Sequence, residues 1–507
     1  MERKKAVFPL LVLVVLISLF SCKKEEQIPE PVEGSVRVIS VRIEGVYAAL
    51  DPGTRTFTAT LPCVTDFSSL SVVFSTAADS IRCGDQDLAE TNTGIDLSEP
   101  LVVRFFKDDV YQDYTLAVRN TGLPVVRIET PGKKTINSKD VWMEGATIRI
   151  ELADGTVDFE GDMDIRGRGN STWNYPKKPY AFRLPKKSPI LSMPEHKRWI
   201  LLANWKDRTL LRNDAAFWLS RHTGLPYTVR GQFVELVLNG KHMGNYDLCE
   251  QIKINQNRVA VDEMDPKETD PGKITGGFLL EADTYYDEPL KFRYSKLFNI
   301  PWMVKEPDEE DISPEAYAYI QQWIQDLEVL MKDTKKVQAH AYEEYLDVDT
   351  AIDYLLVEEL TGNQDFYNSW PEWGPHSAYL YKQRGGKLYH GPVWDFDYMV
   401  FVPNNAGRWV GANRTLFYSA LLKDEKFRAR LLERWELYKN DLKKLPEYLD
   451  AQADYIRLSE QYNQTMWPID NKENGDEKMT FQQAVDRAKQ AFLDKWNWMD
   501  KNIKNLR

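Results

Sequence analysis

The sequence has few of the side chains that zinc sites and thiol chemistry need, with only six histidines and four cysteines among 507 residues. No His-Glu-x-x-His arrangement occurs and the cysteines lack zinc-like spacing, which argues against zinc enzymes. A Gly-x-Ser-x-Gly elbow and a Walker-type phosphate loop are also absent, so α/β-hydrolase and P-loop chemistry is disfavoured. Glycoside hydrolysis by paired carboxylates stays open, because aspartate and glutamate together number 77.

The chain also lacks long basic tracts, internal repeats and low-complexity segments. Lysine and arginine number 65, so the formal net charge is -12 and nonspecific binding to nucleic acid or anionic lipid is disfavoured. With 43% hydrophobic and 12% aromatic residues, the chain can bury sizeable cores. We therefore expect a folded protein that does not bind nucleic acid.

The first residues predict export and lipidation. Arg3, Lys4 and Lys5 precede an apolar run over residues 6–20, and Ser21-Cys22 ends it. The run is shorter than the roughly 20 apolar residues that span a bilayer, and the pattern is typical of a secretory signal with a lipobox. Residues 1–22 are thus predicted to be a lipoprotein signal peptide, with Cys22 as the lipidated first residue of the mature protein. An ordinary signal peptide with an incidental cysteine is the alternative.

Residues 23–34, which begin Lys-Lys-Glu-Glu and contain prolines, are predicted to be a solvated tether. An acidic segment directly after the lipidated cysteine resembles the surface-export signals of Bacteroidetes-type lipoproteins. This resemblance implies lipid anchoring at the outer membrane, with the protein facing outward.

Residues 35–122 have the pattern of short β-strands. Ile39, Val41 and Ile43 alternate with more polar neighbours, and strand-like runs recur over 69–75, 100–106 and 112–118 with turn signals between them. This spacing predicts a small immunoglobulin-like β-sandwich, acting as a spacer or a docking module. It contains Cys63 and Cys83, and whether they form a disulfide is left open.

Residues 123–507 predict a second, larger α+β domain. The sequence is β-rich up to about residue 284, and helical spacing of apolar residues follows over 314–332, 350–360 and 484–503. A β-rich half followed by a helical half places an active site between the two.

Two acidic segments of this domain predict a metal site. Asp365 and Asn368 lie in the first segment, and Asp395 and Asp397 in the second, where apolar residues precede and follow the acids. Oxygen ligands held at a strand end suit Mg²⁺ or Mn²⁺, which leave positions open for phosphate. This is the side-chain set of a phosphoryl-transfer site. The alternative is that the acids are turn residues that satisfy backbone donors.

A glycine-containing turn upstream supports phosphate binding. Arg166 and Arg168 alternate with glycines, and the paired Lys177 and Lys178 follow. Such a turn brings backbone N–H groups close to phosphate, and the cations add positive charge.

Six ordered blocks together resemble the CotH family, the spore-coat protein H kinase-like proteins, over roughly residues 125–500. The blocks are RGRGNSTW at 166–173 with PKKPYAFRL at 176–184, NWKDRTLLRN at 204–213, FVELVLNGKHMGNYDLCEQIKINQNRV at 233–259, GGFLLEAD at 276–283, NQDFYN at 363–368 and GPVWDFD at 391–397. The resemblance implies an atypical protein kinase that binds ATP with a divalent metal and phosphorylates serine or threonine of surface or secreted proteins. A noncatalytic surface module that binds protein or glycan is the alternative, because ATP is scarce outside the cytoplasm.

The resemblance also implies roles for single residues. Lys178 corresponds to the lysine that contacts phosphate and Glu250 to its acidic partner, while Arg166 belongs to the nucleotide-binding turn. Asp365 corresponds to the catalytic-loop aspartate and Asp395 to the metal-binding aspartate. Asn368 and Asp397 are second metal ligands. The sequence departs from ordinary kinases in the short spacing from Asp365 to Asn368 and in Asp-Phe-Asp where they have Asp-Phe-Gly.

Each role has a structural alternative. Lys178 would solubilise an edge strand, and Glu250 would be a strand-end carboxylate. For the NWKDRTLLRN block we expect a helix cap at Asp207 and a surface ion pair of Arg212, not a direct contact with ATP. Glu281 and Asp283 either serve the nucleotide site or end a strand.

Overall fold

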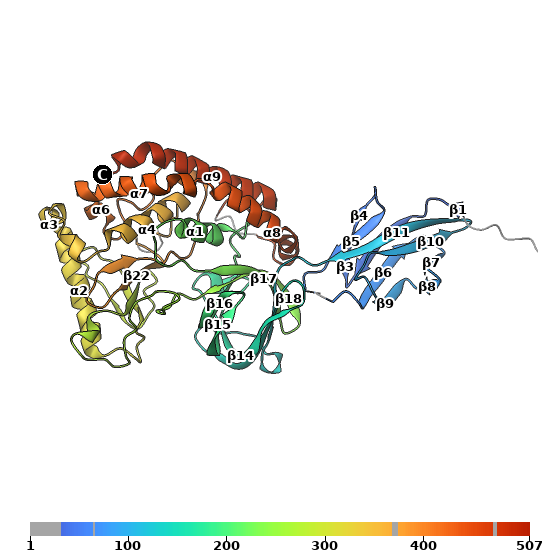
Figure 1. The fold of residues 1–507 in the computed structure, drawn as a ribbon, viewed down its shortest axis with the longest axis horizontal. Coiled ribbons are helices and arrows are strands. Elements are labelled where there is room, and N and C mark those ends of the chain that lie inside the picture. Colours follow the sequence, from blue (N-terminus) through green and yellow to red (C-terminus); the bar gives the residue numbers. More distant parts are fainter. Residues whose placement is uncertain (1–31, 64–65, 368–373, 470–473) are drawn as a thin grey trace, which may run out of the picture. The chain divides into compact units, whose positions relative to one another are not determined.

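The computed structural model of the chain describes residues 32–63, 66–367, 374–469 and 474–507 (Figure 1). Cys22, most of the predicted tether and Asn368 lie outside these residues. No helix within them is both long enough and apolar enough to cross a membrane. Contacts divide the chain into two compact units, one of residues 32–59 and 68–118 and the other of residues 60–67 and 119–507.

The first unit consists of two sheets. One has the order β4-β5-β11-β10-β7-β8 with β1 added to β11, and the other has the order β3-β2-β6-β9. The strands are β1 (Val32–Glu33), β2 (Val38–Ile43), β3 (Val46–Tyr47), β4 (Ala49–Asp51), β5 (Thr56–Thr60), β6 (Leu70–Thr76), β7 (Ser80–Cys83), β8 (Gln86–Leu88), β9 (Thr91–Ile95), β10 (Leu101–Lys107) and β11 (Val110–Arg119).

A shared core joins these two sheets. Phe74 of β6 meets Phe105 of β10 edge to face, with ring centroids 5.4 Å apart, and both side chains are buried. The immunoglobulin-like strand order stays a prediction. Cys63 and Cys83 are both free thiols, so the structure does not contain the disulfide that the sequence left open.

The second unit begins with a closed barrel in the order β12-β13-β14-β15-β16-β18-β17 (Figure 1). Ile165, Phe182 and Trp199 are paired across β14, β15 and β16, and all three are fully buried in the barrel core. Because side chains alternate along a strand, their neighbours face outward. The strands are β12 (Val125–Glu129), β13 (Met143–Glu151), β14 (Val157–Gly167), β15 (Tyr180–Ile190), β16 (Met193–Leu202), β17 (Gly231–Leu238) and β18 (Lys241–Glu250).

A five-stranded sheet and a set of helices complete the unit. The sheet order is β20-β21-β19-β22-β23, from β19 (Phe278–Ala282), β20 (Lys291–Phe292), β21 (Trp302–Glu306), β22 (Ala378–Lys382) and β23 (Leu388–His390). The α-helices are α1 (Arg212–Arg221), α2 (Pro314–Lys332), α3 (Thr334–Gln338), α4 (Val348–Thr361), α5 (Pro403–Ala406), α6 (Tyr418–Leu421), α7 (Glu425–Leu442), α8 (Leu445–Met466) and α9 (Phe481–Asn502). Short 3-10 helices are η1 (Pro131–Lys133), η2 (Thr172–Asn174), η3 (Lys273–Thr275), η4 (Ala341–Glu344) and η5 (Ile503–Asn505).

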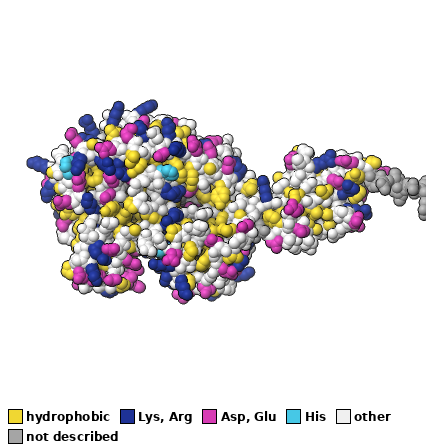
Figure 2. Space-filling model, viewed as in Figure 1, with side chains coloured by type: hydrophobic (Ala, Val, Ile, Leu, Met, Phe, Trp, Pro, Cys, Tyr) yellow, Lys and Arg dark blue, Asp and Glu magenta, His cyan; other side chains and the backbone are white. Residues whose placement is uncertain are grey.

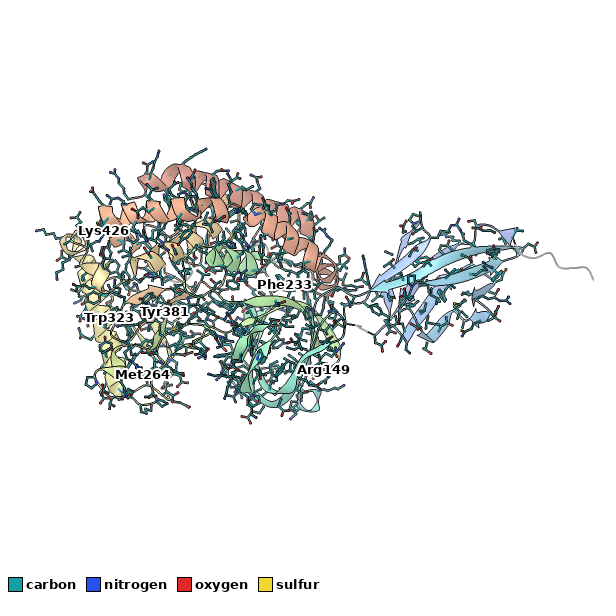
Figure 3. All side chains as sticks on the ribbon, in the orientation of Figure 1. Arg149, Phe233, Met264, Trp323, Tyr381 and Lys426 are labelled. Atoms are coloured by element: carbon teal, nitrogen blue, oxygen red, sulfur yellow. The ribbon has the colours of Figure 1, made fainter. Side chains whose placement is uncertain are left out.

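One large apolar core joins the barrel to the helices. Phe233 of barrel strand β17 and Tyr381 of β22 belong to it, and Trp323 of α2 packs against it (Figure 3). The predicted α+β class is confirmed by this mixture of sheets and helices.

Local signals explain where the helices begin and end. Ser313 caps α2 by accepting from the Ala316 N–H, and Pro314 occupies the first turn, so the helix spans the predicted residues. The last long helix begins three residues before the predicted Ala484, because Thr480 and Gln483 form a capping box. Helix α4 ends at Gly362, which takes a left-handed conformation with φ of 66°.

Candidate active site

A cavity of about 730 Å³ lies between the outer face of the barrel and the five-stranded sheet. The space-filling view is hollowed between the barrel and the part of the second unit that carries this sheet (Figure 2). Cations and carboxylates both line the cavity, with Arg166, Arg168 and Lys206 on the barrel side and Asp365 and Asp395 on the other.

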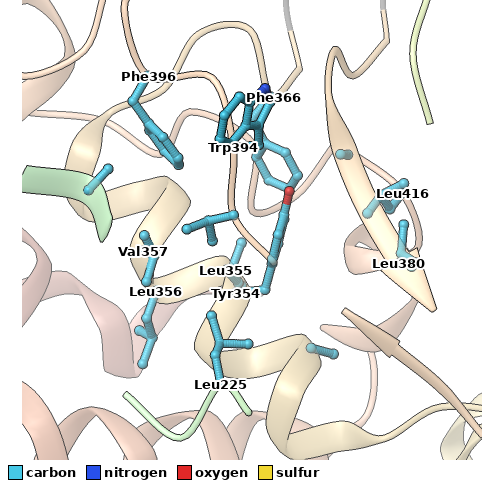
Figure 4. Packing of buried hydrophobic residues seen from close by; sticks show 14 of the residues in the cluster. Leu225, Tyr354, Leu355, Leu356, Val357, Phe366, Leu380, Trp394, Phe396 and Leu416 are labelled. Carbon is cyan, nitrogen blue, oxygen red and sulfur yellow. The ribbon is translucent and has the colours of Figure 1, made fainter. Parts of the chain in front are cut away.

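Buried aromatic neighbours set the orientation of the Asp395 and Asp397 side chains. Trp394 and Phe396 alternate with Asp395 and Asp397, and both rings lie in the apolar core, where Trp394 stacks on Phe217 (Figure 4). With the rings held in the core, the two carboxylates between them line the cavity. Asp395 adopts a left-handed backbone with φ of 70°, which is uncommon outside glycine and is typical of functional positions.

Side chains from distant segments fix the backbone of this acidic loop. Asn213 Oδ1 accepts from the Phe396 N–H at 2.8 Å. Asn474 accepts from the Met399 N–H at 2.7 Å and donates to the Asp397 carbonyl at 2.8 Å. Arg212 Nε donates to the Val400 carbonyl at 2.9 Å. These hydrogen bonds position the backbone of the loop.

Arg212 belongs to a buried network and not to a surface ion pair, so that expectation was wrong. Its side chain is 1% exposed and contacts Asp207 and Asp476, with 2.7 Å to the second carboxylate. Burial opposes its charge, yet the two carboxylates raise the pKa of Arg212. The arginine is buried because it connects the start of α1 to the acidic loop, and two carboxylates there compensate its charge. Asp207 does accept from the Arg212 N–H at 2.8 Å, close to the cap that we expected.

Electrostatics make the acidic loop favourable for a cation. Burial raises the pKa of Asp395, although Arg168 and Lys206 oppose that shift. Burial also raises the pKa of Asp397, and the charge of Asp395 raises it further. Two carboxylates that repel each other beside a cavity, the buried Asp397 and the half-buried Asp395, are stabilised by a bound metal ion.

The donor set fits a metal that keeps several nonprotein ligands. Among the residues that the structure describes, no three acidic, histidine or cysteine side chains are grouped as a ready metal site. Asp395 and Asp397 supply two carboxylates, and Mg²⁺ is commonly held by one or two carboxylates together with water and substrate phosphate. They are therefore the residues that would hold it.

Asp365 is held by a second set of hydrogen bonds. Asn363 Oδ1 accepts from the Asp365 N–H at 3.0 Å, and Asn363 Nδ2 donates to Glu358 at 2.9 Å. The Asp365 carbonyl accepts from the His376 N–H at 2.8 Å. Burial raises the pKa of Glu358 to about 8. This network sets the backbone from which Asp365 reaches the cavity.

The structure brings together four of the predicted residues and leaves two others apart. Arg166, Asp365, Asp395 and Asp397 line the cavity, but Lys178 and Glu250 do not. Lys178 Nζ donates to the Trp173 carbonyl at 2.6 Å.

Glu250 is fully buried and is bound by a cation and a phenol. Its carboxylate accepts from Arg230 at 2.8 Å and from the Tyr227 hydroxyl at 3.0 Å. Its contacts are those of a buried structural ion pair.

Sequence reasoning missed two ion pairs at the cavity. Lys305 on β21 lies 3.0 Å from Glu281 on β19, and both line the cavity. Although burial opposes its charge, Glu281 and neighbouring groups raise the pKa of Lys305 well above its usual value. His376 Nδ1 lies 2.7 Å from Asp283. The one signal in the sequence was Lys305, a charged residue that directly follows the apolar run Trp302-Met303-Val304.

The adjacent lysines differ in position. Lys177 is 1% exposed, lines the cavity, and donates to the Ala203 carbonyl at 2.8 Å and to the Asn245 carbonyl. Burial lowers the pKa of Lys177 to about 7. It supports the cavity wall by linking the backbone of β18 to the segment that directly follows β16.

A cavity with cations on one wall and converging buried carboxylates on the other is typical of a kinase-like site. Residues 165–499 match the family model described as CotH kinase protein. The chain therefore belongs to the CotH kinase family.

Other comparisons add little. No curated protein matches the chain. Among solved structures, a DUF4623 family protein from Bacteroides eggerthii matches with 10% identity over 43% of this chain and 98% of that chain, at a TM-score of 0.14. A likeness this low does not bear on the fold.

Proposed function

We propose that the protein transfers the γ-phosphate of ATP to serine or threonine of surface or secreted proteins, using Mg²⁺ or Mn²⁺. The observation that carries the proposal is the placement of Asp365, Asp395 and Asp397 in one cavity opposite the cations of the barrel face. A scaffold has no physical need for buried carboxylates that repel each other beside a cavity, because ionised groups are costly to bury.

Each acid has a separate task in this reaction. Asp365 accepts the proton of the acceptor hydroxyl as its oxygen bonds to the γ-phosphorus and the bond to the β-phosphate oxygen breaks, which leaves ADP. Asp395 and Asp397 hold the metal, which when bound neutralises charge on the phosphates. The hydrogen bonds to Phe396 and Asp397 keep the two carboxylates in place.

Of the two cations predicted to contact the nucleotide only Arg166 faces the phosphates, and Lys305 and Lys206 were not predicted. Lys305, Arg166 and Lys206 line the cavity and supply positive charge, and Glu281 orients Lys305. In this proposal Lys305, not Lys178, is the lysine that contacts phosphate. Glu281, not Glu250, is its acidic partner. Lys178 and Glu250 instead stabilise the barrel wall.

A thermal-shift titration with ATP and Mg²⁺ or Mn²⁺ tests the proposal without a known acceptor. ATP at about 100 times its dissociation constant adds about 2.7 kcal/mol to the free energy of unfolding, so we expect a clear rise in Tm. The rise in Tm should be seen only with ATP and metal together, and neither ATP alone nor metal alone should produce it. No rise with any nucleotide, from a folded sample, would favour the noncatalytic surface module.

We also propose that Cys22 anchors the protein in the outer membrane and that it faces outward. The support is the charged and apolar pattern of residues 1–26, and the family match does not bear on it. Protease added to intact cells should degrade the protein. Survival until the cells are lysed would place it on the periplasmic leaflet.

A further inference from the structure

Three arginines surround one tryptophan on the outside of the barrel. The guanidinium carbons of Arg166, Arg183 and Arg198 lie 4.5, 4.8 and 5.0 Å from the ring centroid of Trp142. We call these four residues the arginine ridge. Contact with the indole face stabilises a guanidinium, but it does not neutralise the charge.

The strand register forces these charges together. Arg183 of β15 is paired directly with Arg198 of β16, and on its other side with Asp164 of β14. Arg166 lies two residues further along β14, on the same outward face as Asp164. Like charges directly opposite each other destabilise a sheet, so an anion bound beside Arg183 and Arg198 would reduce their mutual repulsion.

Only one of the three arginines forms ion pairs within the described residues. Arg183 pairs with Asp164 at 2.6 Å and with Glu144 at 3.8 Å. Within the described residues neither Arg166 nor Arg198 forms an ion pair, and the Arg166 Nε is buried without a hydrogen-bond partner. Burial lowers the pKa of both arginines, and the positive charge of neighbouring arginines adds to the shift. Asp140 and Glu288 partly offset this at Arg166, and Glu306 and Asp308 partly offset it at Arg198.

The ridge separates the active-site cavity from a second hollow. Arg166 lines the cavity that contains Asp365, whereas Arg183 and Arg198 line an open hollow of about 390 Å³ together with Lys197, Asp162 and Asp164. A chain whose hydroxyl reaches Asp365 and which leaves the cavity past Arg166 therefore crosses the other two guanidiniums.

We propose that the arginine ridge binds an acidic segment of the acceptor polypeptide, next to the residue that is phosphorylated. That the bound polypeptide is phosphorylated rests on the proposed function, whereas the binding of an acidic chain to the ridge does not. A guanidinium binds carboxylate through two parallel hydrogen bonds, and successive acidic side chains can engage successive arginines. The substrate class is thus a serine- or threonine-containing polypeptide rich in aspartate or glutamate.

Fluorescence anisotropy tests this with the full chain and no nucleotide. The probe is a labelled peptide with one serine among glutamates, compared with the same peptide carrying lysine for glutamate. We expect binding of the acidic peptide alone, weakening as salt rises. Arg198→Gln and Arg183→Gln should each weaken it about two- to fivefold, the range of a partly exposed ion pair.

Arg149→Gln is the matched control. Arg149 lies on the same barrel but outside the ridge and pairs with Glu151 at 2.8 Å (Figure 3), so this variant should bind the peptide normally. Equal affinity of Arg198→Gln and the parent, or no binding of the acidic peptide, would overturn the proposal. Displacement by equimolar inorganic phosphate would overturn it too, by showing a site for small anions. The ATP-dependent rise in Tm should be unchanged in Arg198→Gln, so failure of the kinase proposal is seen separately.

Discussion

Replacing Asp395 with asparagine is expected to abolish the stabilisation by ATP and metal without destabilising the unliganded protein. Burial raises the pKa of Asp395, so the folded state disfavours its ionised form and gains no stability from the charge. The metal, in contrast, needs that charge. The rise in Tm equivalent to about 2.7 kcal/mol should disappear. Phosphotransfer should fall about 10³-fold, because a bound metal contributes several kcal/mol of charge stabilisation.

The matched control is Asp494→Asn, which makes the same change at an exposed site on α9. Asp494 only accepts from Gln490 at 2.9 Å, so both the unliganded Tm and the ATP-dependent shift should match the parent. An Asp395→Asn protein that still shows the full metal-dependent shift would contradict the metal role of Asp395.

Arg212→Met is expected to lower the free energy of unfolding of the second unit by about 3–5 kcal/mol, the cost of leaving buried carboxylates without their cation. The variant leaves the buried Asp207 and Asp476 without their ion-pair partner and also removes the hydrogen bond to the Val400 carbonyl. Denaturant unfolding followed by tryptophan fluorescence measures this selectively, because all 15 tryptophans lie at or after residue 142.

Arg457→Met is the control for this effect. Arg457 pairs with Asp454 on the surface of α8, with 43% and 72% of the two side chains exposed. Its loss should cost no more than about 0.5 kcal/mol. Adding Asp476→Asn to Arg212→Met should recover part of the stability, because one uncompensated charge is removed. If Arg212→Met costs no more than Arg457→Met, the buried network does not support the fold as described.

Local sequence was enough for the elements whose signals lie within a few residues. The apolar residues of 314–332 follow helical spacing, and Ser313 caps the helix at that point, so the predicted and observed bounds of α2 agree. The burial of the acidic loop beside the core could also be predicted, because the neighbouring residues Trp394 and Phe396 are apolar and pack in that core.

Long-range pairing determined the rest. Strands β12 and β17 close the barrel in parallel, with Val125 opposite Glu235, and no local pattern specifies that pairing. The pair Lys305 and Glu281 forms because β19 and β21 are neighbours in the sheet.

The lysine pair shows the same limit at a single position. Lys177 and Lys178 both precede β15, which begins at Tyr180, and lie outside any helix or strand, so no regular alternation places their side chains. The tertiary structure places Lys177 there and turns Lys178 toward Trp173, and the sequence could not distinguish the two.

The hydrogen bonds of Asn474 mean that the acidic loop can be fixed only after a much later part of the chain has been synthesised. A growing chain that has reached Asp397 already carries every acid of the site, but the carboxamide that fixes its backbone comes 77 residues later. Asp476, which completes the charge balance of Arg212, comes later still. A chain that ends before Asn474 therefore lacks the hydrogen bonds that fix the acidic loop and the second carboxylate that balances the charge of Arg212.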